Sequence, residues 1–421
     1  MAPVYPPANA RLKSLTSIDE AFARIASLAQ PVQGDETLAL AASLGRITAR
    51  DLRTEAALPR FDHSAMDGFG LCAVDLTRPV PFDLVVSARV FAGGAPASKV
   101  SEGGAVRLLT GAPIPAGVKA VVPEEACVVS RDGVRILKGV TPGSNIRRRG
   151  EDAAQDSVIV ENGTRLDARH VAILSAAGIS SLHARRRVRV GLLSVGDELR
   201  ASGERLDPGQ IHDVNGPMLQ ALLHEPAVEL VDFGLQRDDR AGLASLLHEA
   251  AKRVDILVSS GGVSGSDADH VAAAIGDAGG AARTFKLALK PGKPLLAGRI
   301  GSTPMIGLPG NPVAALVNFM LFVRPLLAVQ AGTAAVRPRG YRALAAQPIA
   351  HRAGRAEFAP ARIVARTKDG QAQIAVLRPS GAARLHPLVL ADGLVEIGPE
   401  RQDIATGEAV DFHAFHASFS T

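Results

Sequence analysis

The chain has 421 residues, a formal net charge of +5 at pH 7 and 47% hydrophobic residues, but only 4% aromatic residues and no tryptophan. A chain of this length is expected to form roughly two to four domains. The mild charge and the shortage of aromatic residues for base stacking argue against a nucleic-acid-binding protein, and the two cysteines, Cys72 and Cys127, form neither a metal-binding pair nor a disulfide framework.

The first predicted element is a helix that starts at the capping box Ser17-Ile-Asp-Glu20. Apolar residues then recur on one helical face, and these are Ile18, Phe22, Ile25 and Leu28. A strand is predicted near residues 46–52. A second helix is predicted at residues 168–177, where Asp167 occupies the N-cap position and Gly178 lies just past the end.

Between these two helices, residues 55–150 have the pattern of a β domain. Short apolar runs at residues 82–91, 105–109, 120–122 and 134–137 are separated by glycine and proline. The simplest organisation is therefore a helical first domain that is interrupted by an inserted β domain.

From residue 189 onward, strand and helix patterns alternate. Strands are predicted at 189–193, 228–233, 255–259 and 304–307, and helices after Asn215, at 239–252, from Asp267 and at 312–323. This alternation predicts a parallel sheet covered on both faces. The basic stretch 185–189 is interpreted as a linker before this domain, and the pattern becomes β-rich again from about Val336.

The apolar stretch 312–331 is interpreted as a buried helix rather than a membrane helix. It contains Asn318, Arg324 and Pro325, whereas a membrane helix needs ~20 largely uninterrupted apolar residues. The amino-terminal sequence lacks the apolar core of a signal peptide, and the cysteine content suits a reducing compartment. We therefore expect a cytoplasmic protein without a membrane partner.

Four loops of the predicted α/β domain indicate a ligand site. They read SVGDEL (194–199), GGVSGSDAD (261–269), KLALKPGKP (286–294) and GLPGNPVAA (307–315). Each follows or flanks a short apolar run, which places it at the edge where parallel sheets bind ligands. Amides at helix starts attract phosphate, and carboxylates beside them can hold a hard metal ion. The loops predict a site for a phosphorylated ligand with a metal.

Seven motifs in chain order make the sequence recognisable. They are FDHSAMDGFG, LLTGAPIPAG, NIRRRGED, VGDEL, GGVSGSDAD, KPGKP and LPGNPVAA. Together they resemble the molybdopterin molybdenumtransferases, the MoeA-type enzymes related to the E domain of gephyrin. The resemblance runs from about residue 12 to residue 323 and more weakly to the carboxyl terminus.

The resemblance implies a fold, a reaction and partners. The implied domains are a discontinuous helical domain (10–54 and 151–184), an inserted β domain (55–150), an α/β molybdopterin-binding domain with a mostly parallel sheet (185–332) and a C-terminal β domain (333–421). The implied enzyme inserts molybdate into adenylated molybdopterin with Mg²⁺ and releases AMP and molybdenum cofactor. It works as an elongated homodimer, whose cleft lies between the α/β domain of one subunit and the β domain of the other. Other cofactor-synthesis proteins or molybdoenzyme chaperones are further expected partners.

The positions that match the family's functional residues are mostly acidic or basic. The implied catalytic residues are Asp67, Thr110, Asp152, Glu198, Asp238 and Asp269, with Glu198, Asp67 and Asp269 as metal ligands. The implied substrate-binding residues are Gly262, Ser264, Lys286, Lys290, Lys293, Pro309, Asn311 and Pro312. Several positions depart from the family pattern: Val214 replaces a small polar residue, Ser266 replaces a glycine, and His63 and Phe69 replace the more frequent Asn and Tyr.

Most of the charged or hydroxyl residues among these also have a purely structural explanation. Asp67 and Thr110 can complete their own turns, Asp238 can cap a helix, Asp269 can complement a helix dipole, and Asp152 can belong to a solvated charged strip. The three lysines can form a solvated face. A molybdopterin carrier or scaffold without turnover and a molybdopterin adenylyltransferase are the alternative functions, and tungstate is an alternative to molybdate.

Overall fold

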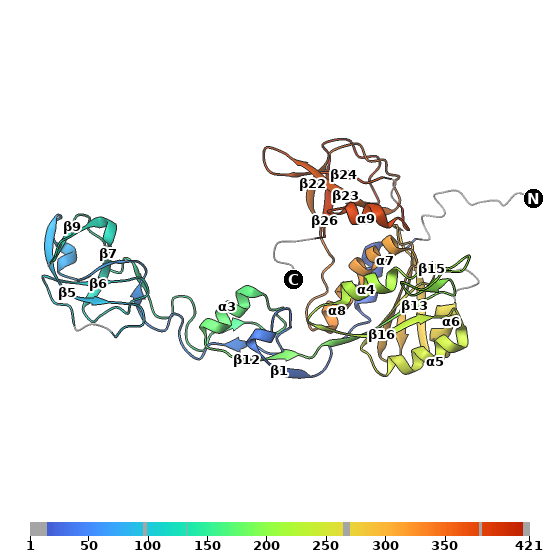
Figure 1. Cartoon of the computed structure of the whole chain (residues 1–421), viewed down its shortest axis with the longest axis horizontal. Helices are drawn as coiled ribbons and strands as arrows, with labels where there is room; N and C mark the ends of the chain where they lie inside the picture. Colours follow the sequence, from blue (N-terminus) through green and yellow to red (C-terminus); the bar gives the residue numbers. More distant parts are fainter. Residues whose placement is uncertain (1–14, 96–98, 132, 264–269, 379–380, 416–421) are drawn as a thin grey trace, which may run out of the picture.

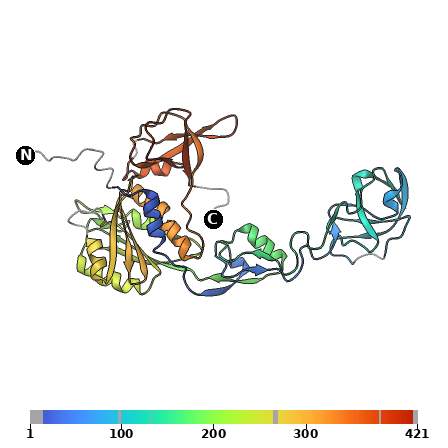
Figure 2. The same cartoon turned by 180° about the vertical axis from the view of Figure 1, so that it is seen from behind.

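The computed structural model describes residues 15–95, 99–131, 133–263, 270–378 and 381–415 of an elongated chain. The inserted β domain lies at one end, and the α/β domain and the C-terminal β domain lie together at the other (Figure 1). The view from behind shows the same separation, with α3 and its neighbouring strands in between (Figure 2).

The first domain is built mainly from short antiparallel strand pairs. Strand β1 (Asp35–Ala39) pairs with β12 (Ser181–Arg185), and β2 (Leu52–Arg53) pairs with β11 (Val158–Val160). Within the described residues its one α-helix is α3 (Ala168–Ala176). The prediction of a helical domain is therefore wrong. Strand β1 was not predicted from the sequence, because four of its five residues are exposed and it has no buried apolar face.

Helix α2 (Ile18–Ala26) starts where the capping box predicted it, with the Glu20 amide donating to Ser17 Oγ at 3.1 Å. However, it does not pack in the first domain. Its apolar face contacts η4 (Phe319–Val323) and α8 (Arg324–Gln330), and it belongs to the same hydrophobic core as the central sheet. Helix α2 therefore packs in the core of the α/β domain, whereas the sequence analysis placed it in the first domain.

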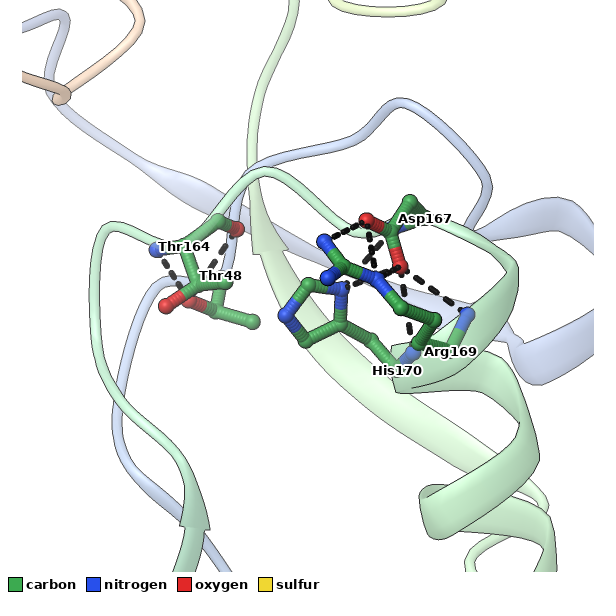
Figure 3. Close-up of polar contacts among 5 residues, drawn as sticks. All are labelled: Thr48, Thr164, Asp167, Arg169 and His170. Carbon is green, nitrogen blue, oxygen red and sulfur yellow. Dashed lines mark hydrogen bonds and ion pairs between the residues drawn. The ribbon is translucent and has the colours of Figure 1, made fainter. Parts of the chain in front are cut away.

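The start of helix α3 is fixed by reciprocal hydrogen bonds (Figure 3). The Asp167 carboxylate accepts the amide N–H of Arg169 at 2.9 Å, and the Asp167 amide donates to the His170 ring at 3.1 Å. Thr48 Oγ1 accepts the Thr164 amide at 2.9 Å beside this cap. The Arg169 guanidinium, followed by the backbone amides, lowers the pKa of Asp167. Asp167 is confirmed as the N-cap residue.

The inserted β domain is one six-stranded sheet with the order β7-β4-β6-β5-β9-β8. Its strands are β4 (Gly68–Cys72), β5 (Phe82–Val90), β6 (Gly104–Leu108), β7 (Val118–Pro123), β8 (Cys127–Val129) and β9 (Gly133–Ile136). The four predicted strands all fall within or next to these elements. A separate pair, β3 (His63–Ser64) with β10 (Ile146–Arg147), brings the two ends of the insertion together.

The α/β domain has a six-stranded sheet with the order β16-β13-β17-β21-β20-β18. The strands β16 (Val228–Gln236), β13 (Val188–Val195), β17 (Ile256–Ser260) and β21 (Thr303–Leu308) run parallel, as predicted. The strands β20 (Pro294–Ile300) and β18 (Gly280–Lys286) add an antiparallel edge that was not predicted.

Helices cover both faces of this sheet. One core holds side chains of α4 (Asn215–Leu223), α7 (Pro312–Asn318), η4 and α8, and the opposite core holds those of α5 (Arg240–Ala251) and α6 (His270–Asp277). The basic stretch predicted as a linker instead contributes to two strands, because Arg185 ends β12 and Arg189 lies in β13.

The apolar stretch after the Gly-Asn-Pro turn forms a continuous helical segment, Pro312–Gln330, with a π-helical turn at η4. Within the part of the chain that the structure describes, it alone is long and apolar enough to cross a membrane, and 72% of its most apolar window is buried inside the protein. The interpretation as a buried helix fits this packing.

The C-terminal β domain is a small barrel. Its strands are β22 (Tyr341–Ala345), β23 (Ala356–Arg366), β24 (Ala372–Val376), β25 (Gly393–Ile397) and β26 (Ala409–Ala414). The sheet closes because β25 pairs with both β26 and β23. Helix α9 (Leu385–Leu390) and a two-residue strand of the α/β domain, β19 (Leu289–Lys290), pack against it.

Candidate functional site

A cavity of about 480 Å³ opens beyond the carboxyl ends of β13, β17 and β21. This is the edge where open α/β sheets bind their ligands. Five of the predicted site residues line this cavity, and they are Glu198, Asp238, Gly262, Pro309 and Asn311. Pro312 is buried at the first position of α7 and is not among the lining residues.

The floor of the cavity is a hydrogen-bonded network at the start of α4. Asp213 Oδ1 accepts the amides of Asn215 and Gly216, both at 3.0 Å. The Asn215 side-chain amide donates to Ser260 Oγ and to the Gly310 carbonyl, both at 2.7 Å. This network joins α4 to the turn before α7, so the loops around the cavity are held by one another.

The network also leaves polar atoms available. Ser194 Oγ and Asn215 Oδ1 are buried and have no hydrogen-bond partner within the described ranges. Buried polar atoms normally have partners, and their absence calls for a water, an ion or a ligand. The sequence reading missed Asp213, Asn215 and Ser260. The Asp-Val-Asn-Gly run before a predicted helix was the available signal, because Asp and Asn favour helix starts.

Val214 occupies the N-cap position of α4 and makes no side-chain cap hydrogen bond. Its side chain lines the cavity and Val214 is 39% exposed. Because Asp213 binds the first amides of the helix, the replacement of a polar residue at position 214 does not leave these amides without an acceptor. Its effect is an apolar patch on the cavity wall.

The two acidic residues of the VGDEL loop have different surroundings. Glu198 is exposed and lines the cavity. Asp197 Oδ1 instead accepts the Asp238 amide and the Arg237 guanidinium, both at 3.4 Å. Asp197 therefore joins this loop to the loop before α5, while Glu198 faces the space that a ligand can reach.

Gly261 makes the close approach of two strand ends possible. Its φ is +88°, and a Cβ at this position would lie 2.2 Å from the Val195 carbonyl oxygen. A Gly261→Ala variant is expected to lose about 1–3 kcal/mol of unfolding free energy and to lose ligand affinity, because the Gly261 loop must move away from β13. Chemical denaturation and ligand titration measure the two effects. Gly276→Ala is the matched control, since a Cβ at Gly276 meets open space, and an equal loss in both variants would contradict the explanation.

The three predicted lysines do not line this cavity, although Pro294 beside them does. They lie around one tight loop, in which the Leu287 amide donates to the Lys293 carbonyl at 2.7 Å. All three are exposed. Lys290 Nζ contacts Glu357 of the C-terminal barrel at 3.0 Å, and among the described residues Lys286 and Lys293 have no ion-pair partner.

In the inserted β domain, Asp67 and Thr110 form a pair. Asp67 Oδ1 accepts both the hydroxyl and the backbone amide of Thr110 at 2.7 Å. The hydroxyl, followed by the amide, lowers the pKa of Asp67. The sequence motifs at 61–70 and 108–117 thus meet in space, and the Asp67 carboxylate is ionised at neutral pH with its other oxygen available.

The charged strip at 147–152 is largely paired with itself and with Asp62. Arg147 contacts Asp152 at 2.7 Å and also contacts Glu151. Arg148 contacts Asp62 at 2.8 Å, and the Arg149 amide donates to the same carboxylate at 2.8 Å. Asp152 is therefore an ion-pair partner in this chain, which agrees with the structural explanation of this residue.

The predicted metal ligands do not come together within one chain. Glu198 lies in the α/β domain, whereas Asp67 lies in the inserted β domain at the far end of the molecule (Figure 1). The first domain separates Glu198 from Asp67 within one chain, so their grouping at one metal ion stays a prediction that needs a second subunit. Asp269 and Ser264, together with Ser266, lie outside the described residues.

The fold and the cavity define a class of protein. A mostly parallel α/β sheet carries a cavity lined by acidic side chains at its carboxyl edge, and two β domains belong to the same chain. This is the construction of an α/β ligand-binding protein.

Comparison with known proteins gives the family. Residues 16–178 match the MoeA N-terminal region (domain I and II), residues 191–329 match a probable molybdopterin binding domain, and residues 342–415 match the MoeA C-terminal region (domain IV). The chain belongs to the molybdopterin molybdenumtransferases, enzymes of molybdenum cofactor biosynthesis.

Individual relatives cover nearly the whole chain. A molybdopterin molybdenumtransferase of Haemophilus influenzae is 32% identical over 405 residues, which are 96% of this chain and 99% of that protein. Molybdopterin molybdenumtransferase 2 of Mycobacterium tuberculosis is 34% identical over 381 residues, 88% of this chain and 93% of that protein. A crystal structure of a molybdopterin biosynthesis MoeA protein from Pyrococcus horikoshii has 27% identity and a TM-score of 0.79, covering 95% of this chain and 100% of that one.

Proposed function

We propose that this enzyme inserts molybdate into adenylated molybdopterin, with Mg²⁺-dependent cleavage of the adenylate and release of AMP. The observation that carries the proposal is the cavity of the α/β domain, which Glu198, Asp238 and Asn215 line, and where Asn215 Oδ1 is buried without a hydrogen-bond partner among the described residues. A large ligand with phosphate and heterocycle groups suits this cavity, because the cavity wall contains both glycine-rich backbone and polar side chains.

The donor set of the cavity fits Mg²⁺. This ion prefers carboxylate oxygens and is usually held by one or two carboxylates together with substrate phosphates. Glu198 and Asp238 provide such carboxylates, and the described residues contain no group of three or more His, Cys, Asp or Glu that would hold a metal alone. When bound, Mg²⁺ would supply charge neutralisation for the phosphates.

The remaining steps rest on the chain's own residues. The glycine-rich loop at Gly261 and Gly262 allows the backbone to approach the adenylate. Asn215 orients the ligand through its side-chain carbonyl oxygen, which has no partner within the described residues. The lysines bind the molybdate dianion, and Asp67, held by Thr110, approaches the ligand from the opposite wall of the cleft.

Two groups of predicted site residues lie apart in one chain, and we call them half-sites: the α/β cavity with Glu198, and the Asp67–Thr110 pair of the inserted β domain. Their separation supports a homodimer. Because Asp67 and Thr110 lie far from the α/β cavity of their own chain (Figure 1), a second copy must provide them if both half-sites act on one ligand. We place the enzyme in the cytoplasm, where its cysteines remain reduced. Cofactor-synthesis proteins or molybdoenzyme chaperones would receive the product.

The proposal is tested by AMP release from adenylated molybdopterin by the purified full chain with Mg²⁺. We expect AMP release that depends on molybdate and is accompanied by cofactor formation. Binding of the pterin without AMP release would instead identify a carrier, and ATP-dependent adenylation of molybdopterin would identify an adenylyltransferase. Replacing molybdate by tungstate in the same assay determines which oxoanion the enzyme prefers.

A further inference from the structure

The C-terminal barrel takes up a strand that belongs to the α/β domain. Strand β19 pairs in parallel with β23, and the register places Lys290 directly opposite Glu357. The Ala356 amide also donates to the Ala288 carbonyl at 2.9 Å. The backbone around Lys290 is therefore attached to the barrel, not only to the domain that carries the cavity.

The side chains of this register pair form an unequal ion pair. Lys290 Nζ lies 3.0 Å from each carboxylate oxygen of Glu357. The Glu357 side chain is only 11% exposed, whereas the Lys290 side chain is 53% exposed. Since a mostly buried carboxylate needs a partner for its charge, and Lys290 is the one cation that contacts it among the described residues, this contact is expected to persist.

The pair gives Lys290 a property that its two neighbours do not have. Lysine is a compact charge on a flexible four-carbon chain, and Lys286 and Lys293 are exposed without an ion-pair partner in the described part of the chain. The Lys290 ammonium group contacts the mostly buried Glu357 carboxylate, while about half of the Lys290 side chain is exposed to solvent. An ammonium group has three donors, so it can bind a further anion while it keeps this contact.

We propose that Glu357 of the C-terminal barrel is a positioning residue, which holds the Lys290 ammonium group where it binds the tetrahedral oxoanion substrate. The inference rests on the proposed role of Lys290 in binding molybdate. It makes the barrel part of the substrate-binding apparatus, because the barrel supplies the carboxylate that orients a lysine of another domain.

A double-mutant cycle tests this coupling. In Glu357→Gln the side chain keeps its shape but loses its charge, and the KM for molybdate is expected to rise about three- to tenfold with little change in the KM for adenylated molybdopterin. Lys290→Gln is expected to raise the KM for molybdate at least as much. In the Lys290→Gln background, Glu357→Gln should have no further effect on the KM for molybdate. With Lys290 intact, Glu357→Asp keeps the charge and should show a molybdate affinity between those of Glu357→Gln and the wild type.

The controls separate this role from damage to the barrel. Glu249→Gln removes an exposed ion pair with Lys252, 2.7 Å long, and should leave both KM values unchanged. Thermal unfolding shows whether the barrel remains folded, and calorimetric titration of molybdate into the full chain repeats the comparison without turnover.

The outcomes are distinguishable. Additive effects of the two substitutions, an unchanged KM in Glu357→Gln, or a lower KM would overturn the positioning role while the proposed reaction stands. A normal molybdate affinity in Lys290→Gln would show that Lys290 does not bind molybdate, and this would overturn the inference. Absence of molybdate-dependent AMP release by the wild-type chain would contradict the proposed function itself, and calorimetry would still show whether the Lys290–Glu357 pair binds molybdate.

Discussion

Two inactive variants of this enzyme are expected to restore each other's activity. Asp67→Asn and Glu198→Gln should each reduce AMP release by at least about 100-fold, because each removes a carboxylate from a site that handles concentrated negative charge. When both chains are co-expressed with different affinity tags, the purified mixed dimer is expected to recover about half of the wild-type turnover. The reason is that, in the proposed homodimer, two-fold symmetry leaves one site with both carboxylates and one site with neither.

This result would depend on the elongated form of the chain. If the Asp67 and Glu198 that act together belonged to the same chain, the mixed dimer would contain two damaged sites and would remain inactive. A mixed dimer without activity would therefore exclude a site shared between subunits. Co-expression of two differently tagged Asp67→Asn chains controls for tagging, since it should yield dimers without turnover.

The largest stability effect is expected at Asp255, which directly precedes β17 and contacts Arg186 at the point where the chain enters the α/β domain. Its carboxylate accepts two hydrogen bonds from Arg186 at 2.7 and 2.9 Å and the Arg189 amide at 2.8 Å. Arg186 also donates to the Gln33 carbonyl at 2.8 Å, so this ion pair joins both chain segments that connect the first domain to the α/β domain. Asp255→Asn is expected to lower the unfolding free energy by about 2–3 kcal/mol, measured by urea denaturation.

The pH dependence of this effect has a defined sign. Burial alone would raise the pKa of Asp255, but the hydrogen bonds from Arg186 and the Arg189 amide outweigh it and lower the pKa. The stabilisation is therefore complete above the unfolded-state pKa of about 3.9 and is lost as the pH falls through the lower folded-state pKa. The difference between wild type and Asp255→Asn should be constant near neutral pH and shrink in acid. Asp277→Asn, which breaks an exposed pair with Arg240, should have a much smaller effect.

The sequence predicted the elements whose own side chains define them. The parallel strands β13, β17 and β21 are mostly apolar and buried, and α2 and α3 begin at the predicted side-chain caps, so local pattern was sufficient. For α5 the capping residue is Asp239, not Asp238, which the sequence analysis considered as the cap. The strands β18 and β20 were missed. Strand β18 lies at the sheet edge with most of its residues at least partly exposed, so its existence depends on pairing with β20. The place of α2 was also missed, because a helical pattern shows which face is buried but not which domain buries it.

The site was predictable to a similar extent. The motifs identified Glu198, Asp238, Asp67 and Thr110 as positions on functional loops, and the cavity contains the first two. Their partners were not predictable, because the pairing of Asp67 with Thr110 and of Lys290 with Glu357 depends on sheet register between segments 43 and 67 residues apart. The sequence analysis already allowed a structural role for Asp152, but its contact with Arg147 became known only from the fold.

The packing of α2 has a consequence for the synthesis of the chain. The helices that cover its apolar face, η4 and α8, lie roughly 300 residues further along the sequence. At about 5–20 residues per second, the ribosome needs on the order of 15–60 seconds to make them after α2 has emerged. During this interval the inserted β domain has time to fold, while Ile18, Ala21 and Ile25 lack their final neighbours. Helix α2 is therefore among the last of the described elements to reach its native position, although it is made before the other helices and strands of the α/β domain.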